Sequence, residues 1–469
     1  MKKTEKDEKK SAVEELKKKL LYKQKSGFEI EADKAAVEEY CKGYAEFLNN
    51  AKTEREAVRE AVALAEKAGF KPFSFGDKPV KGQGYYAVNR GKSLVLFIVG
   101  KEPIEKGVYI SAAHIDSPRL DIKQRPLYES DGMGFFKTHY YGGIKKYHWV
   151  ATPLALHGTV VRADGTSVDV KIGEDDGDPV LYIDDLLPHL GRDQMRKAAS
   201  EVISGEQLNV LLGTEPVKGE GSELVKLNIL RLLNEKYGIT EADFLSAELC
   251  CVPAFKARDV GLDRSLIGGY GHDDRVCAYP ALTAILKEKQ PKHTVMVVLA
   301  DKEEIGSEGT TGMKSRFAFD VISDLASAFK ANENTVRANS KCISADVGAA
   351  FDPNFPEVYD KRNNCFLNHG VVVMKFTGAG GKSGSNDAGA EFCGYIRKVF
   401  DSGKVLWQTS ELGKVDQGGG GTVAKFFAEK GIDVIDVGVP VLSMHSPYEV
   451  VSKIDVYMME RASTAFFAS

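Results

Sequence analysis

The sequence predicts an α/β fold in which a mixed, largely parallel sheet is flanked by helices and interrupted by an inserted β-rich domain. From residue 261 onward, short apolar runs alternate with longer segments of helical periodicity, which is typical of parallel-sheet domains. The block 123–258 lacks that alternation and is rich in paired apolar runs and turn residues. A chain of 469 residues is long enough for two domains. We therefore expect one domain from residues 1–122 and 259–469, and a second from residues 123–258.

The first elements follow from local signals. Residues 1–30 are rich in lysine and glutamate, with an amphipathic helix expected over residues 13–22. Residues 33–68 predict one helix, because Gly69 stands where a helix would end. In the middle block, alternating apolar residues around Asp164-Gly165 predict a hairpin over residues 149–172.

The remaining elements alternate along the chain. Strands are predicted at residues 94–99, 108–113, 294–300, 342–346, 371–376 and 434–439. Helices are predicted at residues 276–287, 388–400, 422–430 and 453–467. In open α/β sheets, functional sites gather outside the carboxyl ends of the strands. We therefore examine the residues that follow each strand.

Composition excludes several classes of function. A net charge of −4 and a pI near 6.2 give no support for binding nucleic acid or an anionic membrane. No segment has the pattern of a signal peptide or the length of a membrane span. The seven cysteines include no CxxC pair, which favours a reducing compartment, and we expect the cytoplasm. The glycines of residues 378–381 do not form a phosphate-binding loop, because its first glycine would fall at Phe376.

A histidine and an aspartate mark the end of the second strand. The segment ends in His114-Ile-Asp116. Neutral imidazole is a good ligand for zinc, and a carboxylate two residues on can hold the other ring nitrogen. The alternative is a strand-end histidine with a capping aspartate.

Two pairs of adjacent carboxylates follow in the chain. Asp273 and Asp274 lie in a glycine-rich loop before a helix, where they repel each other unless a cation is present. One of them can bridge two metals, although a helix cap with an ion-paired neighbour is the ordinary explanation. Glu303 and Glu304 follow an apolar strand, so that one can bind metal while the other acts as general base. The alternative is a solvated acidic loop.

Two further strand-end residues complete the set. Asp346 follows an apolar strand, and His445 lies in a tight turn after another. Each is by itself an ordinary loop residue. Together with the preceding groups they supply imidazole and carboxylate without thiolate, which suits two divalent ions that share an oxygen bridge.

This order of motifs resembles the aspartyl-aminopeptidase family, the M18 zinc aminopeptidases, and in particular its bacterial branch. The resemblance runs from about residue 94 to the C-terminus. It rests on the stretches HIDSPRLDIK, GHDDRVCAY, DKEEIGSEGTTGM and SMHSPYE. The family belongs to the co-catalytic zinc exopeptidases, whose α/β domain carries an inserted β-rich domain used for dimerisation.

The resemblance implies a role for each motif residue. It implies that each subunit binds two divalent metal ions. The family implies zinc, and cobalt and manganese are alternatives. The implied ligands are His114, Glu304, Asp346 and His445, with Asp273 as the bridging carboxylate. Asp116 would orient His114, and Glu303 would act as the general base.

Two more residues are implied to contact substrate. The segment around His189 is similar to an inserted-domain loop whose histidine reaches a neighbouring subunit's active site. A surface histidine and a direct metal ligand are its alternatives. Lys375 would pair with an acidic side chain, but the Arg-Tyr-Ala pattern that accompanies this lysine in acid-specific members is absent, which leaves that preference open. Its alternative is a solvated strand-end lysine.

The expected function is a metallo-aminopeptidase that removes the first residue from peptides with a free N-terminus. By resemblance it forms dimers that assemble into a dodecamer. The enzyme alternative is a di-metal deacylase of N-acyl amino acids. The non-enzymatic alternative is a scaffold on a peptidase fold, which would ordinarily have lost a ligand.

Overall fold

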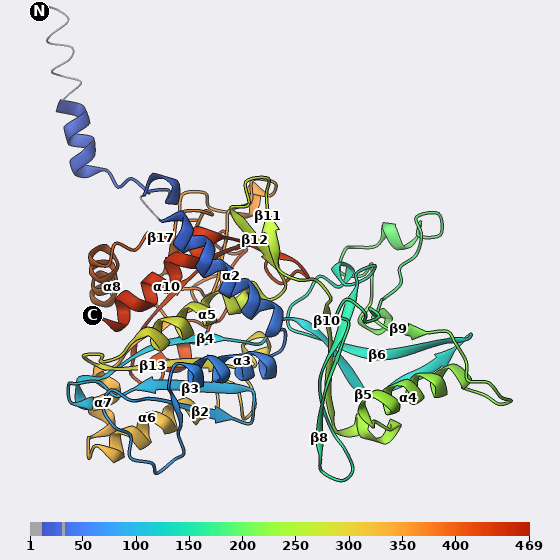
Figure 1. Ribbon diagram of the computed structural model, residues 1–469. Coiled ribbons are helices and arrows are strands. Elements are labelled where there is room, and N and C mark those ends of the chain that lie inside the picture. Colours follow the sequence, from blue (N-terminus) through green and yellow to red (C-terminus); the bar gives the residue numbers. More distant parts are fainter. Residues whose placement is uncertain (1–11, 31–32) are drawn as a thin grey trace, which may run out of the picture.

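The protein has a mixed α/β fold with helices on both sides of its main sheet, as predicted. The structure is a computed structural model that describes residues 12–30 and 33–469. It consists of a larger α/β part, which contains the C-terminus, and a smaller lobe of long antiparallel strands beside it (Figure 1). Residues 12–20 are helical. No described helix combines the length and the apolar character needed to span a bilayer.

A nine-stranded sheet forms the centre of the larger part. In spatial order its strands are β1 (Lys71–Pro72), β2 (Gly84–Asn89), β3 (Ser93–Ile98), β13 (Thr294–Ala300), β4 (Val108–His114), β14 (Lys341–Ser344), β18 (Asp433–Gly438), β16 (Val371–Met374) and β17 (Trp407–Thr409). The four central strands, from β13 to β18, are parallel. Antiparallel strands flank them on both sides. The strands predicted for this sheet are all present, with ends that differ by at most two residues.

Helices cover both faces of this sheet. One face packs against α2 (Lys34–Asn50), α3 (Glu54–Lys67), α5 (His272–Lys287), α8 (Ala390–Ser402) and α10 (Lys453–Phe467). The other face packs against α6 (Phe317–Ala328), α7 (Glu333–Asn339) and α9 (Ala424–Ala428). Alternate residues of β13 enter the two cores, Val297 on the first side and Val298 on the second. Because both faces are buried, the strand is apolar throughout.

The smaller lobe is a six-stranded antiparallel sheet with its own core. Its spatial order is β8 (Ser167–Ile172), β7 (Leu154–Val161), β10 (Ala247–Pro253), β5 (Arg119–Ser130), β6 (Met133–Tyr141) and β9 (Val210–Gly213). β7 and β8 form the predicted hairpin, and α4 (Leu224–Tyr237) packs on the sheet. The sheet begins and ends slightly before the boundaries predicted at residues 123 and 258. We propose that it forms the inserted domain.

A third sheet was not predicted. Its strands are β11 (Arg258–Val260), β12 (Leu266–Gly269), β20 (Glu449–Ser452), β19 (Pro440–Leu442) and β15 (Gly348–Ala349). β12 leads into the start of α5, and the loop between β19 and β20 contains His445. This small sheet therefore holds two of the candidate site segments next to each other.

Other sequence predictions were wrong in detail. The single helix predicted over residues 33–68 is two helices, because Thr53 begins a new one. Its side chain accepts a hydrogen bond from the Glu56 amide, and the Glu56 carboxylate accepts from the Thr53 amide. This capping box starts α3 and changes the direction of the chain. The helix predicted over residues 422–430 is only α9, and α4 was missed.

A buried ionic network joins the two parts of the molecule. Lys52 and Glu56 come from the α2–α3 corner, and His157 and Glu174 come from the smaller lobe. The Lys52 ammonium lies 2.6 Å from Glu174 and donates to the Pro253 carbonyl at 2.7 Å. The two ring nitrogens of His157 lie 2.8 Å from Glu56 and 3.0 Å from Glu174. A carboxylate at each ring nitrogen favours the charged form of the imidazole.

The pKa shifts agree with this geometry. Burial acts to lower the pKa of His157, but hydrogen bonds to Glu174 and Glu56 outweigh burial and raise the pKa above its ordinary value. Burial acts to raise the pKa values of both glutamates, yet the contacts with His157 and, for Glu174, with Lys52 hold them below the usual range.

We predict that His157→Gln lowers the free energy of unfolding by about 3–5 kcal/mol, because it leaves the buried Glu56 without a charged partner and Glu174 with Lys52 alone. Because the folded pKa of His157 is raised, its contribution is complete below the unfolded value of about 6.5 and is lost as pH rises through the folded pKa. The contribution of the two glutamates is present above about pH 4.3 and is lost as pH falls through their depressed pKa values. Urea unfolding at several pH values would measure both effects.

Arg59→Gln is the matched control, because Arg59 pairs with Asp169 across the same two parts at an exposed position. That variant should lose less than about 1 kcal/mol. Equal losses in the two variants, or a His157 effect that is independent of pH, would contradict the role given to the buried network.

Candidate metal centre

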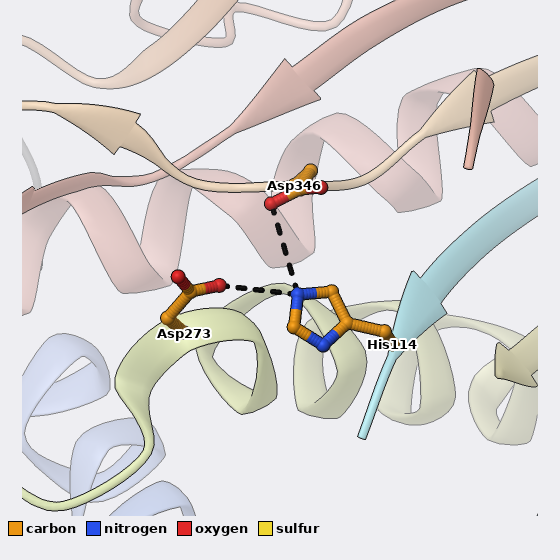
Figure 2. A group of neighbouring side chains, drawn as sticks. All are labelled: His114, Asp273 and Asp346. Atoms are coloured by element: carbon orange, nitrogen blue, oxygen red, sulfur yellow. Dashed lines mark hydrogen bonds and ion pairs between the residues drawn. The ribbon is translucent and has the colours of Figure 1, made fainter. Parts of the chain in front are cut away.

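Strand-end residues converge at the carboxyl edge of the central sheet. His114 is the last residue of β4, and its neighbours β13 and β14 run parallel to it. Asp346 follows β14, and Glu303 and Glu304 follow β13. Parallel strands end at the same edge, so these side chains are brought together. Asp273, at the start of α5, faces His114 and Asp346 (Figure 2).

Asp273 lies between two triads of possible ligands. Its Oδ1 is 3.1 Å from His114 Nε2, which is 4.0 Å from Asp346 Oδ1 (Figure 2). Its Oδ2 is 3.1 Å from His445 Nε2, which is 3.4 Å from Glu304 Oε2. Within each triad the ligand atoms lie within 4.8 Å of one another. Each triad therefore offers one imidazole and two carboxylates, and the two oxygens of Asp273 serve different triads.

Asp274 has a different environment. Its Oδ2 accepts a hydrogen bond from the backbone amide of His114 at 3.2 Å. The two adjacent aspartates therefore have different contacts. Asp273 contributes one oxygen to each triad, and Asp274 accepts a hydrogen bond from the end of β4.

Asp116 organises three of the surrounding segments. His114 Nδ1 lies 3.1 Å from the Asp116 carbonyl oxygen and 3.3 Å from its carboxylate. That carboxylate also accepts the amides of Glu303 at 3.1 Å and Glu304 at 3.2 Å. The hydroxyl of Tyr141 donates to it at 2.8 Å. One buried side chain thus orients a candidate ligand and the turn that carries the paired glutamates.

Glu449 positions Asp273 and His445 on the other side of the centre. The sequence analysis did not identify this residue. Its carboxylate accepts the backbone amides of Asp273 at 3.1 Å and His445 at 2.7 Å. The ring of His445 also contacts the Gly143 carbonyl through Nδ1 at 2.8 Å. The only signal for Glu449 was its place shortly after the SMHSPYE histidine. Tyr141 gave no local signal, because it comes from the other lobe.

The carboxylates of the centre are strongly perturbed. Burial raises the pKa of Glu303 to about 7 and raises those of Glu304 and Asp346 well above their usual range. Burial also acts to raise the pKa of Asp273, but hydrogen bonds from the two histidines hold it below its usual range. Glu304 Oε1 is buried and has no hydrogen-bond partner among the described residues.

The pKa values of the two imidazoles are also raised, in their case by hydrogen bonds and nearby carboxylates and against the effect of burial. Burial acts to lower the pKa of His114, but hydrogen bonds to Asp116 and Asp273 outweigh it and raise the pKa well above the usual range. The pKa of His445 is raised to about 10, because hydrogen bonding to Asp273 and the charge of Glu304 outweigh burial. Such a concentration of buried carboxylates, with one orphaned oxygen, fits cations that would neutralise it. Nitrogen and oxygen donors without thiolate suit zinc and similar divalent ions.

The centre opens into a cavity of about 440 Å³. Glu303 lines it, is 17% exposed at its side chain, and belongs to neither triad. Beyond the centre, the cavity is lined chiefly by the glycines 419–421, by apolar side chains, and by Lys425.

The two predicted substrate contacts lie elsewhere in the described chain. His189 is in an exposed loop of the smaller lobe and does not line the cavity of its own chain. Lys375 follows β16, is about half exposed, forms an ion pair with Asp387, and does not line the cavity either. Lys425, which does line it, was missed, because nothing in the sequence distinguishes it from a surface lysine of a short helix.

Comparison with known proteins identifies one group of relatives. Residues 47–467 match the family model described as aminopeptidase I zinc metalloprotease (M18). A protein of Clostridium acetobutylicum, named a probable M18 family aminopeptidase 1, is 50% identical over 458 residues, which are 95% of this chain and 98% of that protein. The crystal structure of an M18 family aminopeptidase from Thermotoga maritima has a TM-score of 0.92 at 46% identity, and the match covers 95% of this chain and 99% of that one. The dodecamer of yeast aminopeptidase 1 shares the fold, with a TM-score of 0.74 at 22% identity over 92% of this chain and 97% of that one.

If each triad holds one divalent ion, the protein should bind two zinc ions per chain after dialysis, as measured by elemental analysis. Asp273→Ala should retain almost none, because its carboxylate serves both triads. His445→Ala should retain one, because the triad of His114 is intact. Circular dichroism would verify that each variant is folded.

His189→Ala is the control, and it should still bind two ions. A loss of metal in that variant would favour the direct-ligand alternative for His189. An Asp273→Ala protein that still holds two ions would contradict the shared-carboxylate arrangement.

Proposed function

Because this chain belongs to the M18 family of zinc metallo-aminopeptidases, we propose that it cleaves the first peptide bond of unblocked peptides with two metal ions held by the two triads. The observation that carries this proposal is the position of Asp273, whose two oxygens face one triad each. A carboxylate so placed could contribute a ligand oxygen to each of two metal sites, and aminopeptidases are among the enzymes that use a metal pair.

The ligand assignment follows from the geometry. His114 and Asp346 would complete one metal site, and Glu304 and His445 the other, with Asp273 shared between them. Zinc agrees with the family description and with the donor set, while cobalt and manganese can use the same donors. When bound, such ions act as Lewis acids on the scissile carbonyl and lower the pKa of a nearby water.

Glu303 is the group best placed to move protons. It lines the cavity without belonging to a triad, and its backbone amide is held by Asp116. We propose that its carboxylate accepts a proton from the attacking water and delivers it to the leaving amine. The link through Asp116 keeps this base in a fixed relation to His114.

A free α-amine suits the acidic character of the cavity, since an amine can contact one of its carboxylates or a metal. The charge balance also favours an acidic first residue. Two divalent ions would neutralise the four carboxylates of the cavity, Asp273, Glu303, Glu304 and Asp346, which leaves the charge of Lys425 in excess. We therefore propose a preference for N-terminal aspartate or glutamate.

We further propose a homo-oligomer, assembled from dimers into a dodecamer, in which His189 contacts substrate bound to a neighbouring subunit. The loop of His189 exposes three leucines, Leu186, Leu187 and Leu190, by 54%, 52% and 70%. Three exposed leucines within five residues would suit burial against another subunit. Sedimentation that gives a monomeric mass would contradict this assembly.

All seven cysteines are free thiols, which supports the cytoplasm as the compartment.

The function is tested with one pair of substrates. With zinc bound, the protein should release p-nitroaniline from unblocked aminoacyl p-nitroanilides but not from their N-acetylated forms, because the acetyl group removes the amine that the site requires. Release of acetate from N-acetyl amino acids would instead support the deacylase alternative. Metal-loaded protein that is inactive on all of these substrates would favour the scaffold.

A second prediction concerns the base. Glu303→Gln should lower kcat by roughly 10²–10⁴-fold, since it removes a general base while preserving shape. Zinc content should remain that of the wild type, because Glu303 belongs to neither triad. Glu308→Gln, at an exposed position of the same segment, should retain full activity. A Glu303→Gln enzyme that retains substantial turnover with metal bound would exclude this residue as the base.

A further inference from the structure

Lys425 is the only lysine or arginine among the described residues that line the metal cavity. The other charged side chains there are the triad residues and Glu303. Lys425 is partly buried, and in the described part of the chain its ammonium has neither a hydrogen-bond acceptor nor an ion-pair partner. A fully buried lysine is almost always paired. The partly buried Lys425 has no such partner among the described residues and is therefore available to a ligand.

The backbone that carries Lys425 is fixed. The Thr422 hydroxyl, just before α9, donates to the buried Asp436 at 2.7 Å. On the helix, Phe426 and Phe427 are buried in the core on that side of the sheet. Only the lysine side chain is free to adjust, so a ligand at its ammonium would find a partner whose position is largely set in advance.

The ammonium lies against the wall of the cavity. It is 3.7 Å from the place a Cβ would occupy on Gly421, and 5.0 Å from the centre of the Phe426 ring. A side chain at position 421 would occupy space beside the ammonium, which the glycine leaves open. The neighbours of the charge are therefore backbone and an aromatic ring, and neither can neutralise it.

Lys375 has none of these properties. It forms an ion pair with Asp387, which also pairs with Lys382 at 3.4 Å, and it lies outside the cavity. A substrate carboxylate would have to displace Asp387 to reach it.

We propose that Lys425 is the residue that recognises a substrate carboxylate in this cavity, and that it sets the preference for an acidic N-terminal residue where that carboxylate belongs to the first side chain. The contact would be a charge-assisted hydrogen bond from the ammonium to the carboxylate. This inference rests on the proposed aminopeptidase function. The carboxylate can come from the side chain of the first residue or from the C-terminus of a dipeptide, and the two sources are separable.

The experiment compares two substrate pairs on zinc-loaded enzyme. Glutamyl and leucyl p-nitroanilide differ in a side-chain carboxylate, and Leu-Gly and Leu-Gly amide differ in a terminal one. In Lys425→Met, the ratio of kcat/KM within one pair should fall roughly tenfold to a hundredfold toward the neutral substrate. The pair that responds identifies the source of the carboxylate. Lys425→Arg, which keeps the charge, should preserve most of the ratio.

Two measurements guard against a general defect. Lys414→Met removes a positive charge from a neighbouring cavity that shares Thr377 and Leu412 with the metal cavity, and it should leave both ratios at their wild-type values. Calorimetric binding of L-glutamate and L-leucine to the zinc-loaded proteins gives a reading that does not depend on turnover. If the anilide pair responds, Lys425→Met should weaken the binding of glutamate and not that of leucine.

The failures are distinguishable. A wild-type protein that cleaves neither anilide contradicts the proposed function itself. An active wild type whose two ratios are unaffected by Lys425→Met overturns the role of Lys425 alone. The same conclusion follows if Lys375→Met, rather than Lys425→Met, abolishes the preference.

Discussion

The parallel pairing of β4 with β13 and β14 is the constraint on which the candidate metal centre depends. His114 lies opposite Ala300 in the register of β4 and β13, and Ala112 lies opposite Ser344 in that of β4 and β14. This alignment places the exits of three strands at one edge of the sheet. Since side chains alternate between the faces of a strand, a shift by one residue would turn His114 away from the aspartate that faces it. The apolar strands thus have two roles, as the core of the fold and as the frame that sets the spacing of the ligands.

Hydrogen bonds connect the buried ionic network between the two parts of the molecule to the candidate metal centre. The guanidinium of Arg275 donates to the Lys52 carbonyl at 3.0 Å and to the Ser117 hydroxyl at 3.0 Å. That hydroxyl in turn donates to the Asp273 carbonyl at 2.7 Å. The corner whose side chains bind the smaller lobe is therefore connected by fixed hydrogen bonds to the residue shared by both triads. A buried ion pair of this kind is costly to break by removing one partner, so it holds the corner and the smaller lobe in one arrangement.

Sequence reasoning could find the groups that follow strands, because a polar residue after an apolar run is visible locally. His114, Glu304 and Asp346 were identified in this way and lie together in the structure. Residues that act from a distance could not be found. Glu449 acts through backbone amides, and Tyr141 reaches the centre from another sheet. The two lysines illustrate the same limit, since only the fold decides which of them faces the cavity. The third sheet was missed because its strands are too short for a periodic pattern, and the break at Thr53 was missed because helical periodicity continues on both sides of it.

The hydrogen bond from Tyr141 to Asp116 has a consequence for how this architecture can change. All five candidate ligands belong to the α/β part, so the smaller lobe looks dispensable for holding metal. Yet a phenol at the end of one of its strands supports the carboxylate that orients His114 and the glutamate turn. The smaller lobe thus contributes a hydrogen bond to the candidate metal centre. An exchange of this insertion between relatives would succeed only where the incoming lobe presents a hydrogen-bond donor at the same point.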